Sequence, residues 1–316
     1  MRIILITLDD VSFYSLGFVG FFPDFTPNIN KFAEESYTFW NAHCNIPFCE
    51  PSRAVLMTGL YPQNNKSTCF IPIGRGVPHI SQILKNLGYY IVLCGKNFHY
   101  RNMYWDVEFK HRSNYDEALR YSLGFDDKLF LSINLHFAHR QFEASESVNF
   151  NNFPNFLPRT KVMEEEMSAY LMTLRKADEL VGKIINSFNE EDIVILTSDH
   201  GMSFPYVKGD CYGTSTNVPF MIRNNRILKK HDKFNLISHV DFLPTMAEWL
   251  NFEGEFDGDS YYSLLTKDTK RQNQVVYAQL NRMFDGPDCR IRSLIKKDIC
   301  YTINLDQLFP GWCVDG

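Results

Sequence analysis

The 316-residue sequence lacks long apolar runs, and none approaches the roughly 18 to 20 residues that a membrane span requires. It also lacks an excess of basic residues, because 32 Lys and Arg stand against 37 Asp and Glu, for a formal net charge of −5. Proteins that bind nucleic acid favour a basic face. Neither a membrane nor nucleic acid is therefore an expected partner.

Cysteine pairs of the CxxC type are missing too. The eight cysteines are dispersed, whereas secreted disulfide-bonded domains are shorter and denser in cysteine, so we expect mostly buried free thiols in a reducing compartment. The apolar run at residues 3–8 is too short for a signal peptide, and no small-residue cleavage site follows it. If the numbering begins at the natural start, the expected location is cytoplasmic.

The composition is that of a globular protein. Hydrophobic residues make up 45% and charged residues 22%, which supplies a large core and excludes disorder over most of the chain. Short apolar runs alternate with helical stretches, which is typical of an α/β fold, so we expect a mostly parallel central sheet flanked by helices. The predicted strands cover residues 2–8, 89–94, 128–135, 192–198 and 218–222, and the longest predicted helix covers 162–188.

Two helix starts have local signals. Thr26 before Pro27 is typical of an N-cap followed by the first helical residue. A second helix is predicted over 51–58, because Pro51 can open it and Gly59 can end it.

The sequence changes character after residue 251. A polar connection rich in turn formers occupies residues 253–259. We expect residues 1–251 to form the main, catalytic domain and residues 252–316 to form a small C-terminal antiparallel sheet packed on it. Its three short strands are predicted over 275–280, 290–295 and 299–303.

Acidic residues follow two of the predicted strands. Asp9 and Asp10 come after the first strand, and Asp199 and His200 come after the strand at 192–198. Ligands of parallel sheets bind beyond the carboxyl ends of the strands, so the two clusters can converge there. Clustered carboxylates repel unless a positive charge lies between them, and oxygen ligands suit a hard divalent cation. Asp9 or Asp199 could instead cap a helix or a turn.

The segment Cys49-Glu50-Pro51-Ser52-Arg53 places a thiol just before a helix that proline opens. The positive end of the helix dipole favours anionic ligands and lowers the pKa of a thiol. Arg53 adds a fixed positive charge in the first turn. By itself, this segment could carry a thiol nucleophile.

These residues resemble a known family. Cys-x-Pro-Ser-Arg is the signature of the type I sulfatases, within the alkaline phosphatase superfamily. The resemblance covers most of the chain and implies an alkaline phosphatase-like fold that hydrolyses an organic sulfate ester to an alcohol and inorganic sulfate. The segments that carry it are Leu8-Asp9-Asp10, Thr26-Pro27-Asn28, Cys49 to Arg53, Thr58 to Pro62, Gly95-Lys96, Ala138-His139, Ser198 to Gly201, Lys208, Val218-Pro219, and His239 to Asp241 with Pro244-Thr245.

The resemblance implies that a maturation enzyme oxidises Cys49 to Cα-formylglycine. One hydroxyl of the hydrated aldehyde attacks sulfur and expels the alcohol, and loss of the proton of the other hydroxyl then releases sulfate. A serine would form a sulfate ester that has no second hydroxyl to expel the sulfate.

The resemblance also assigns a metal site. Asp9, Asp10, Asp199 and His200, together with modified Cys49, would hold one Ca²⁺ that lowers the pKa of the attacking hydroxyl. Imidazole is a softer ligand than Ca²⁺ usually takes, so Mg²⁺ or another divalent ion is an alternative.

The remaining roles fall on basic residues. By the resemblance, Arg53 would hold the hydrate, and Lys96 and Lys208 would bind sulfate oxygens. His139 would donate to the leaving-group oxygen, and His99 would take the proton that drives sulfate release.

Both histidine assignments have alternatives. Segment 95–99 is Gly-Lys-Asn-Phe-His, one residue longer than the Gly-Lys-x-His of many family members, and this spacing resembles the iduronate-2-sulfatase branch. His99 could also be a surface residue. His136 competes with His139 for the leaving-group role, because the two lie three residues apart after a strand. We favour His139, which follows Ala138 where the family usually has proline.

A sulfated carbohydrate is the favoured substrate class, and three alternatives stay open. A phosphonate monoester or phosphodiester hydrolase can share the signature and the metal ligands. A two-zinc phosphatase would need Ser or Thr as nucleophile, so Cys49 argues against it. A non-catalytic relic would fit the short C-terminal region, although every catalytic position is filled. His239 and Asp241 are interpreted as structural residues near the site.

Overall fold

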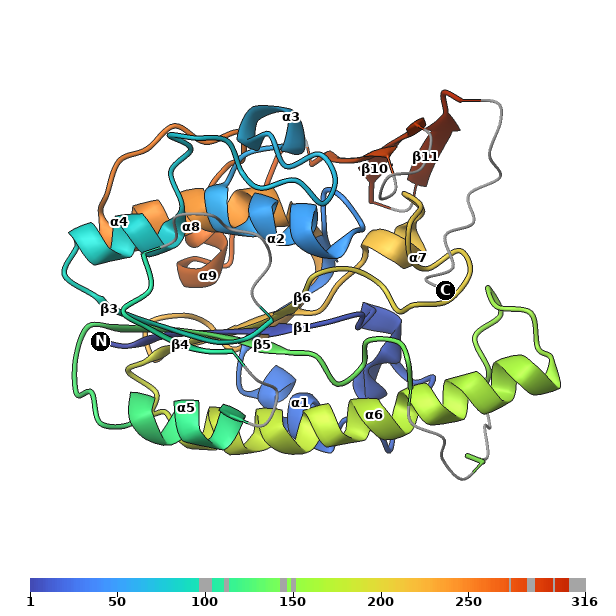
Figure 1. The fold of residues 1–316 in the computed structure, drawn as a ribbon, viewed down its shortest axis with the longest axis horizontal. Coiled ribbons are helices and arrows are strands. Elements are labelled where there is room, and N and C mark those ends of the chain that lie inside the picture. Colours follow the sequence, from blue (N-terminus) through green and yellow to red (C-terminus); the bar gives the residue numbers. More distant parts are fainter. Residues whose placement is uncertain are drawn as a thin grey trace.

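The computed structural model describes residues 1–96, 104–110, 114–142, 147–148, 152–272, 274–282, 288–297 and 299–306. Within them, an eight-stranded sheet has helices on both faces, and a separate three-stranded antiparallel sheet follows, which confirms the predicted fold class (Figure 1). The strands of the large sheet, in spatial order, are β4 (Val107–Phe109), β3 (Tyr90–Gly95), β5 (Leu129–Leu135), β1 (Ile3–Leu8), β6 (Ile193–Ser198), β7 (Phe220–Arg223), β2 (Tyr37–His43) and β8 (Lys230–Ser238).

The large sheet contains both parallel and antiparallel pairs of strands. β1 runs parallel to its neighbours β5 and β6, and β3 runs parallel to β5. β7 is antiparallel to both β6 and β2. Strands β2 and β8 were not predicted from the sequence. Strand β8 opens with the charged stretch Lys-His-Asp-Lys, so no apolar run marks its start.

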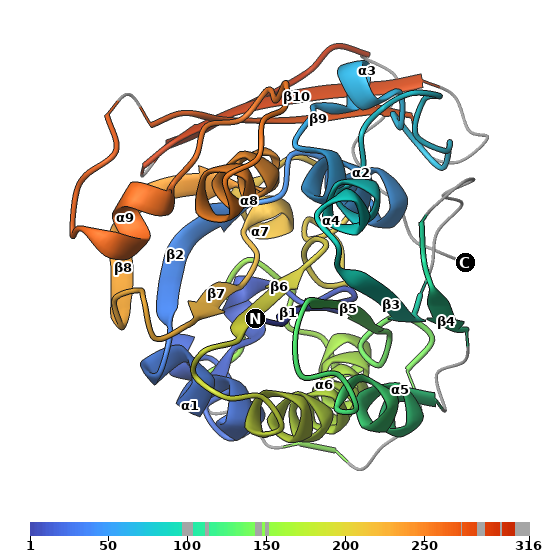
Figure 2. The ribbon, with the colours of Figure 1, turned by 90° about the vertical axis from the view of Figure 1, so that its left-hand side faces the viewer.

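Both faces of the sheet are covered, as Figures 1 and 2 show. Ile3 and Leu5 pack into the core on one face, and Ile4 and Ile6 pack into the core on the other. This two-sided burial explains why β1 is apolar throughout. One face carries α1 (Pro27–Glu34), α5 (Tyr115–Ser122) and α6 (Lys161–Asn186); the other carries α2 (Cys49–Thr58), α4 (Ile80–Asn86), α8 (Phe242–Leu250) and α9 (Tyr262–Thr266).

Helix α1 begins at Pro27 with Thr26 before it, as predicted, whereas the start of α2 differs from the sequence prediction. Thr26 occupies the N-cap position of α1, but its hydroxyl accepts from the amide of Gly17 at 2.8 Å and donates to Asn30 at 3.0 Å rather than capping the helix. α2 begins at Cys49, two residues before Pro51, so the cysteine is the first helical residue rather than the residue before the helix.

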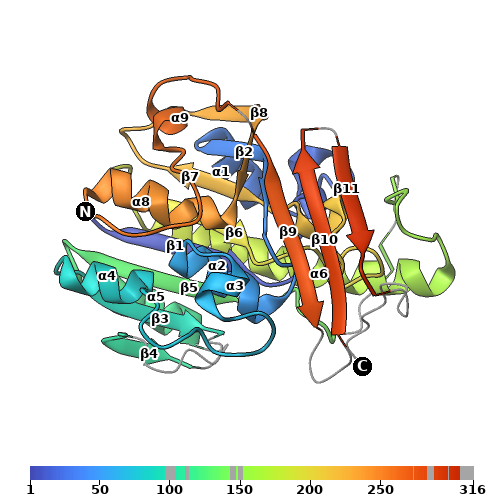
Figure 3. The same cartoon turned by 90° about the horizontal axis from the view of Figure 1, so that it is seen from above.

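The C-terminal sheet contains β9 (Val276–Arg282), β10 (Asp288–Lys296) and β11 (Ile299–Asn304), with β10 in the middle (Figure 3). Its buried face shares a hydrophobic cluster with Ile46 and Phe48, just before α2. The amide of Gln279 also donates to the carbonyl of Asn45 at 2.8 Å. The small sheet therefore supports the segment that leads to Cys49. The domain boundary at residue 251 stays a prediction.

Two expectations from composition can be compared with the structure. Among the described helices, none is long and apolar enough to cross a membrane. The seven cysteines in the described part of the chain are free thiols, and Cys300 alone among them is exposed. Cys313 lies outside the described residues.

Candidate active site

The functional side chains gather at one edge of the large sheet. Because β3, β5, β1 and β6 are neighbouring parallel strands in register, the residues that follow them meet beyond the carboxyl ends of the strands. These residues are Lys96 after β3, His136 after β5, Asp9 and Asp10 after β1, and Asp199 and His200 after β6.

Cys49 reaches this edge from the first turn of α2. Its Sγ atom lies 3.1 Å from Nε2 of His200, and the residue is 3% exposed. Burial by itself raises the pKa of the thiol, but the positive charges of Lys96, Lys208 and His200 outweigh that effect and hold the pKa well below its ordinary value. The surroundings of the sulfur therefore stabilise a negative charge on it.

Asp9 is the centre of a network of donors. Lys96 Nζ lies 2.6 Å from its Oδ2 atom, His136 Nδ1 contacts the same oxygen, and a guanidinium nitrogen of Arg53 lies 3.4 Å from Oδ1. Burial raises the pKa of Asp9, yet Lys96, His136 and Arg53 together lower it well below the usual range. Asp9 is therefore a fully buried but ionised carboxylate.

Asp10 has a second lysine as partner. Lys208 Nζ lies 3.1 and 3.2 Å from its two carboxylate oxygens, and His200 Nε2 lies 3.4 Å away. Asp10 also has a left-handed backbone, with φ of 59°, which aspartate tolerates better than most residues. Lys208 thus pairs with Asp10 as Lys96 pairs with Asp9.

Asp199 has both of its carboxylate oxygens occupied by donors. Oδ1 accepts from the backbone amides of Asp10 at 3.1 Å and His200 at 3.0 Å, and Oδ2 lies 3.0 Å from Arg53. Burial raises the pKa of Asp199 to about 7, with His200 and Arg53 opposing the shift and Asp9 and Cys49 adding to it. Burial is thus the largest cause of the raised pKa at Asp199, whereas the pKa values of Asp9 and Asp10 are lowered overall.

A divalent cation fits the donor atoms that gather at this edge. One donor atom from each of Asp9, Asp10, Cys49 and His200 lies within 4.8 Å of the others, and all four residues are buried. Two carboxylates, an imidazole and a sulfur form a set that several divalent ions accept, while the oxygen donors suit Ca²⁺ or Mg²⁺. Asp199 lies beside this set, 3.7 Å from Nε2 of His200.

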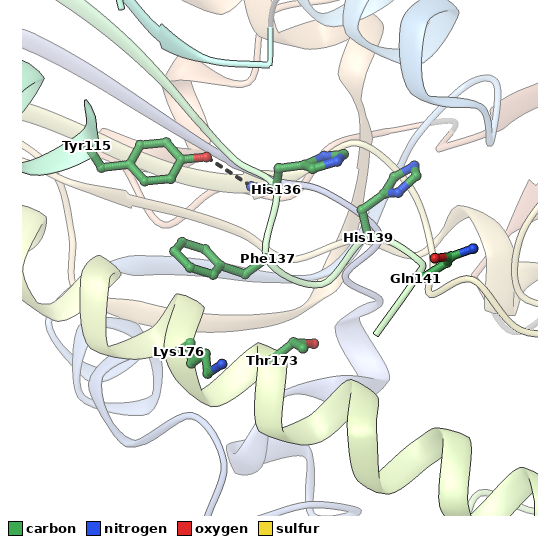
Figure 4. Close-up of a pocket in the computed structure, with 7 residues that line it drawn as sticks. All are labelled: Tyr115, His136, Phe137, His139, Gln141, Thr173 and Lys176. Atoms are coloured by element: carbon green, nitrogen blue, oxygen red, sulfur yellow. Dashed lines mark hydrogen bonds between the residues drawn. The ribbon is translucent and has the colours of Figure 1, made fainter. Parts of the chain in front are cut away.

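Both candidate leaving-group histidines lie at the site, on the segment that follows β5 (Figure 4). The rings of His136 and His139 stack with centroids 4.4 Å apart. Burial lowers the pKa of His139, but a hydrogen bond to Cys49 and the charges of Asp10 and Asp9 raise it overall.

A cavity of about 180 Å³ borders the two rings. Phe137 and Gln141 line it from the segment after β5, and Lys176 on α6 faces it from the opposite side (Figure 4). The cavity therefore leads from His139 toward the helix layer and offers room for a small group.

Buried polar residues hold the nucleophile helix against the sheet. The Ser52 hydroxyl donates to the carbonyl oxygen of Asp199 at 2.5 Å and lies 3.2 Å from Nδ1 of His239. Nε2 of His239 lies 3.3 Å from the Thr197 hydroxyl, so its ring bridges α2 and β6. Asp241 is paired with Arg271 at 2.9 Å. His239 thus has buried polar partners, and Asp241 has a partly buried one.

Other residues had no clear signal in the sequence. Asn134 accepts from Arg53 at 2.6 Å, and its only hint was its position near the end of a predicted strand. Glu50 is fully buried beside Cys49, and neither of its carboxylate oxygens has a hydrogen-bond partner in the described structure. His99 lies outside the described residues, so its predicted role and the iduronate-2-sulfatase-like spacing stay predictions.

Comparison with known proteins agrees with this arrangement. The family model described as Sulfatase matches residues 2–252, which is most of the chain. The chain belongs to the sulfatase family. An "Ulvan-active sulfatase" of Formosa agariphila is 26% identical over 309 residues, covering 89% of this chain and 61% of that relative. The human "N-sulphoglucosamine sulphohydrolase" is 22% identical over 72% of this chain and 56% of its own length.

Solved structures show the same fold. A 2-O GAG sulfatase superimposes with a TM-score of 0.76 at 17% identity, covering 96% of this chain and 82% of that one. The phosphonate monoester hydrolase of Agrobacterium radiobacter superimposes with a TM-score of 0.79 at 14% identity, covering 96% of this chain and 87% of that one. This sulfatase chain spans about three fifths of the length of the first curated relatives it matches.

Proposed function

We propose that this sulfatase hydrolyses an organic sulfate ester, with a sulfated saccharide as the substrate class. The observation that carries the proposal is the position of Cys49. Cys49 is the first residue of helix α2, and its thiol lies close to the carboxylates at the sheet edge. The positive charges of Lys96, Lys208 and His200 hold the pKa of this thiol well below the ordinary value. Such a site favours an anionic nucleophile and an anionic substrate.

The metal and the modified cysteine belong to this proposal. Asp9, Asp10, Asp199 and His200, with residue 49, would hold one Ca²⁺ or Mg²⁺ ion, which would supply a Lewis acid for the sulfate oxygen and the attacking group. Oxidation of Cys49 by a maturation enzyme would supply a hydrated aldehyde as the nucleophile in place of the thiol.

The lysines are placed to bind sulfate oxygens. Lys96 and Lys208 are largely buried, and each is anchored by one aspartate, Asp9 or Asp10. Two ammonium groups whose charges act on the sulfur can also stabilise the charge that grows on the sulfate oxygens as the ester bond breaks. Arg53 is bound to Asp9 and Asp199, so it orients the carboxylates and offsets their charge.

His139 is the proposed proton donor to the leaving alcohol. Its Nδ1 atom faces the carbonyl of Arg140, which can only accept, so Nδ1 carries a proton and Nε2 is left to serve the reaction. Its raised pKa keeps the imidazolium form available. The cavity beside the ring can receive part of the alcohol.

The saccharide class is supported by the names of the relatives. Those names refer to ulvan and to N-sulphoglucosamine, and one solved relative contains its substrate, D-glucosamine-2-N,6-O-disulfate. The acidic and basic groups of the site fit any sulfate monoester, so the sugar and the ring position need a direct test.

The test is turnover by the full chain, coexpressed with a formylglycine-generating maturation enzyme. Wild-type protein should release inorganic sulfate from members of a panel of sulfated saccharides, and Cys49→Ala should release none above background. Mass spectrometry of the peptide that holds Cys49 should show a loss of roughly 18 Da in the wild type. An aryl phosphonate ester serves as the comparison substrate. Faster turnover of this ester than of every sulfate ester would contradict the proposal.

A further inference from the structure

His136 makes a buried contact that the proposed chemistry does not use. Its Nδ1 atom contacts Oδ2 of Asp9, and its side chain is 11% exposed. Lys96 and Arg53 pair with the same carboxylate, which accepts hydrogen bonds as an anion, so Nδ1 of His136 is the donor in this contact. The imidazole is therefore a fixed donor to a proposed metal ligand.

The backbone of His136 is anchored as well. Its amide donates to the Tyr115 hydroxyl at 3.3 Å, and that hydroxyl donates to the carbonyl of Asn134 at 2.9 Å. The ring then stacks on His139. Three contacts from different directions hold the imidazole in one place, which a flexible lysine side chain does not achieve.

We propose that His136 is a positioning residue that holds Asp9 in the orientation needed to bind the metal ion. Lys96 contacts the same carboxylate oxygen, but its ammonium group is also proposed to bind sulfate. His136 is the donor that stays with Asp9 when Lys96 is shared with substrate. Donors of this kind behind a ligand fix its orientation and basicity, and their loss usually weakens metal binding by about 10- to 100-fold.

The test uses calcium affinity, so it needs no turnover. Calcium chloride is titrated into the metal-stripped full chain by isothermal titration calorimetry. His136→Phe keeps a ring over His139 but removes the donor, and should weaken calcium binding by about 10- to 100-fold. His136→Gln keeps an amide donor and should stay within about threefold of wild type. His231→Phe, whose polar partners are Trp40 and Glu34, should bind calcium as the wild type does.

A further variant covers the case in which His136→Phe does not fold. Tyr115→Phe removes the hydroxyl that anchors the His136 backbone and should weaken calcium binding by about fivefold. Thermal unfolding without calcium shows which variants are folded.

The inference rests on the proposed metal role of Asp9, and the outcomes separate the two. Equal affinity in wild type and folded His136→Phe overturns the inference alone, and so does equal weakening by the Phe and Gln variants. If His136→Phe is unfolded, unchanged affinity in Tyr115→Phe overturns it. A wild type that binds no calcium overturns the metal site and the inference together.

Discussion

Nε2 of His200 lies 3.1 Å from Sγ of Cys49, although 151 residues separate the two in the sequence. The same nitrogen lies 3.4 Å from a carboxylate oxygen of Asp10. The contact therefore joins the start of helix α2 to the edge of the sheet where the acids gather. Substitutions at that edge should therefore alter the reaction at Cys49, and substitutions elsewhere should not.

Asp9→Asn should abolish the metal dependence of the reaction. Asparagine keeps the shape of the side chain but removes the charge that Lys96 and Arg53 neutralise. We expect calcium affinity and turnover each to fall by about 100-fold or more. Calorimetry and initial rates at saturating calcium measure the two effects. Asp127→Asn, at an exposed residue, is the control, and an unchanged rate in Asp9→Asn would show that the metal site is wrongly assigned.

His139→Asn should affect poor leaving groups most. A saccharide alkoxide needs a proton as it leaves, so kcat/KM for a sulfated saccharide should fall by about 10²- to 10⁴-fold. The 4-nitrophenolate ion leaves without a proton, so 4-nitrophenyl sulfate should lose far less. Parallel kinetics with both substrates measure the difference. An equal loss for the two esters would remove His139 from the proton-donor role.

Glu50→Gln should change the pH dependence of stability. Burial, with a smaller contribution from ionised Cys49, raises the pKa of Glu50 from its ordinary value of 4.5 to about 7. The folded state then holds this proton where the unfolded state has lost it, so the free energy of unfolding decreases as pH rises from about 4.5 to 7. The effect levels off above pH 7 and amounts to at most about 3 kcal/mol.

Melting temperatures between pH 5 and 8 test this prediction. The difference between Glu50→Gln and wild type should grow with pH in favour of the variant. Glu117→Gln, an exposed residue on α5, should follow the wild type at every pH. A constant difference across the range would mean that Glu50 has an ordinary environment.

Gly95→Ala should damage the site, whereas Gly88→Ala should not. Both glycines have positive φ, 88° and 86°, so alanine carries a backbone cost of about 1 kcal/mol at each. A Cβ at Gly95 would lie 2.1 Å from the carbonyl oxygen of Asn134, whereas the nearest atom at Gly88 is 3.6 Å away. Because Lys96 follows Gly95, kcat should fall only in Gly95→Ala. Denaturant unfolding and steady-state kinetics compare the variants, and equal effects would disprove the clash.

Local patterns in the sequence were enough to predict much of the fold. The apolar runs that became β1, β5 and β6 were visible because both faces of these strands are buried. The three C-terminal strands were found within a few residues of their observed bounds. β8 was missed because its first residues are charged, and its place beside β2 is a long-range pairing that no local window contains.

The sequence by itself determined the chemistry that is available: a cysteine motif, two acidic pairs, and the lysines and histidines that the family resemblance singled out. Tertiary structure alone decided which donors share an oxygen. Strand order placed β5 beside β1, and only then did His136 meet Asp9, while the packing of α2 on the sheet brought Arg53 to Asn134. Side-chain contacts across neighbouring strands depend on sheet order and register, and those are set by packing of the whole chain rather than by nearby residues.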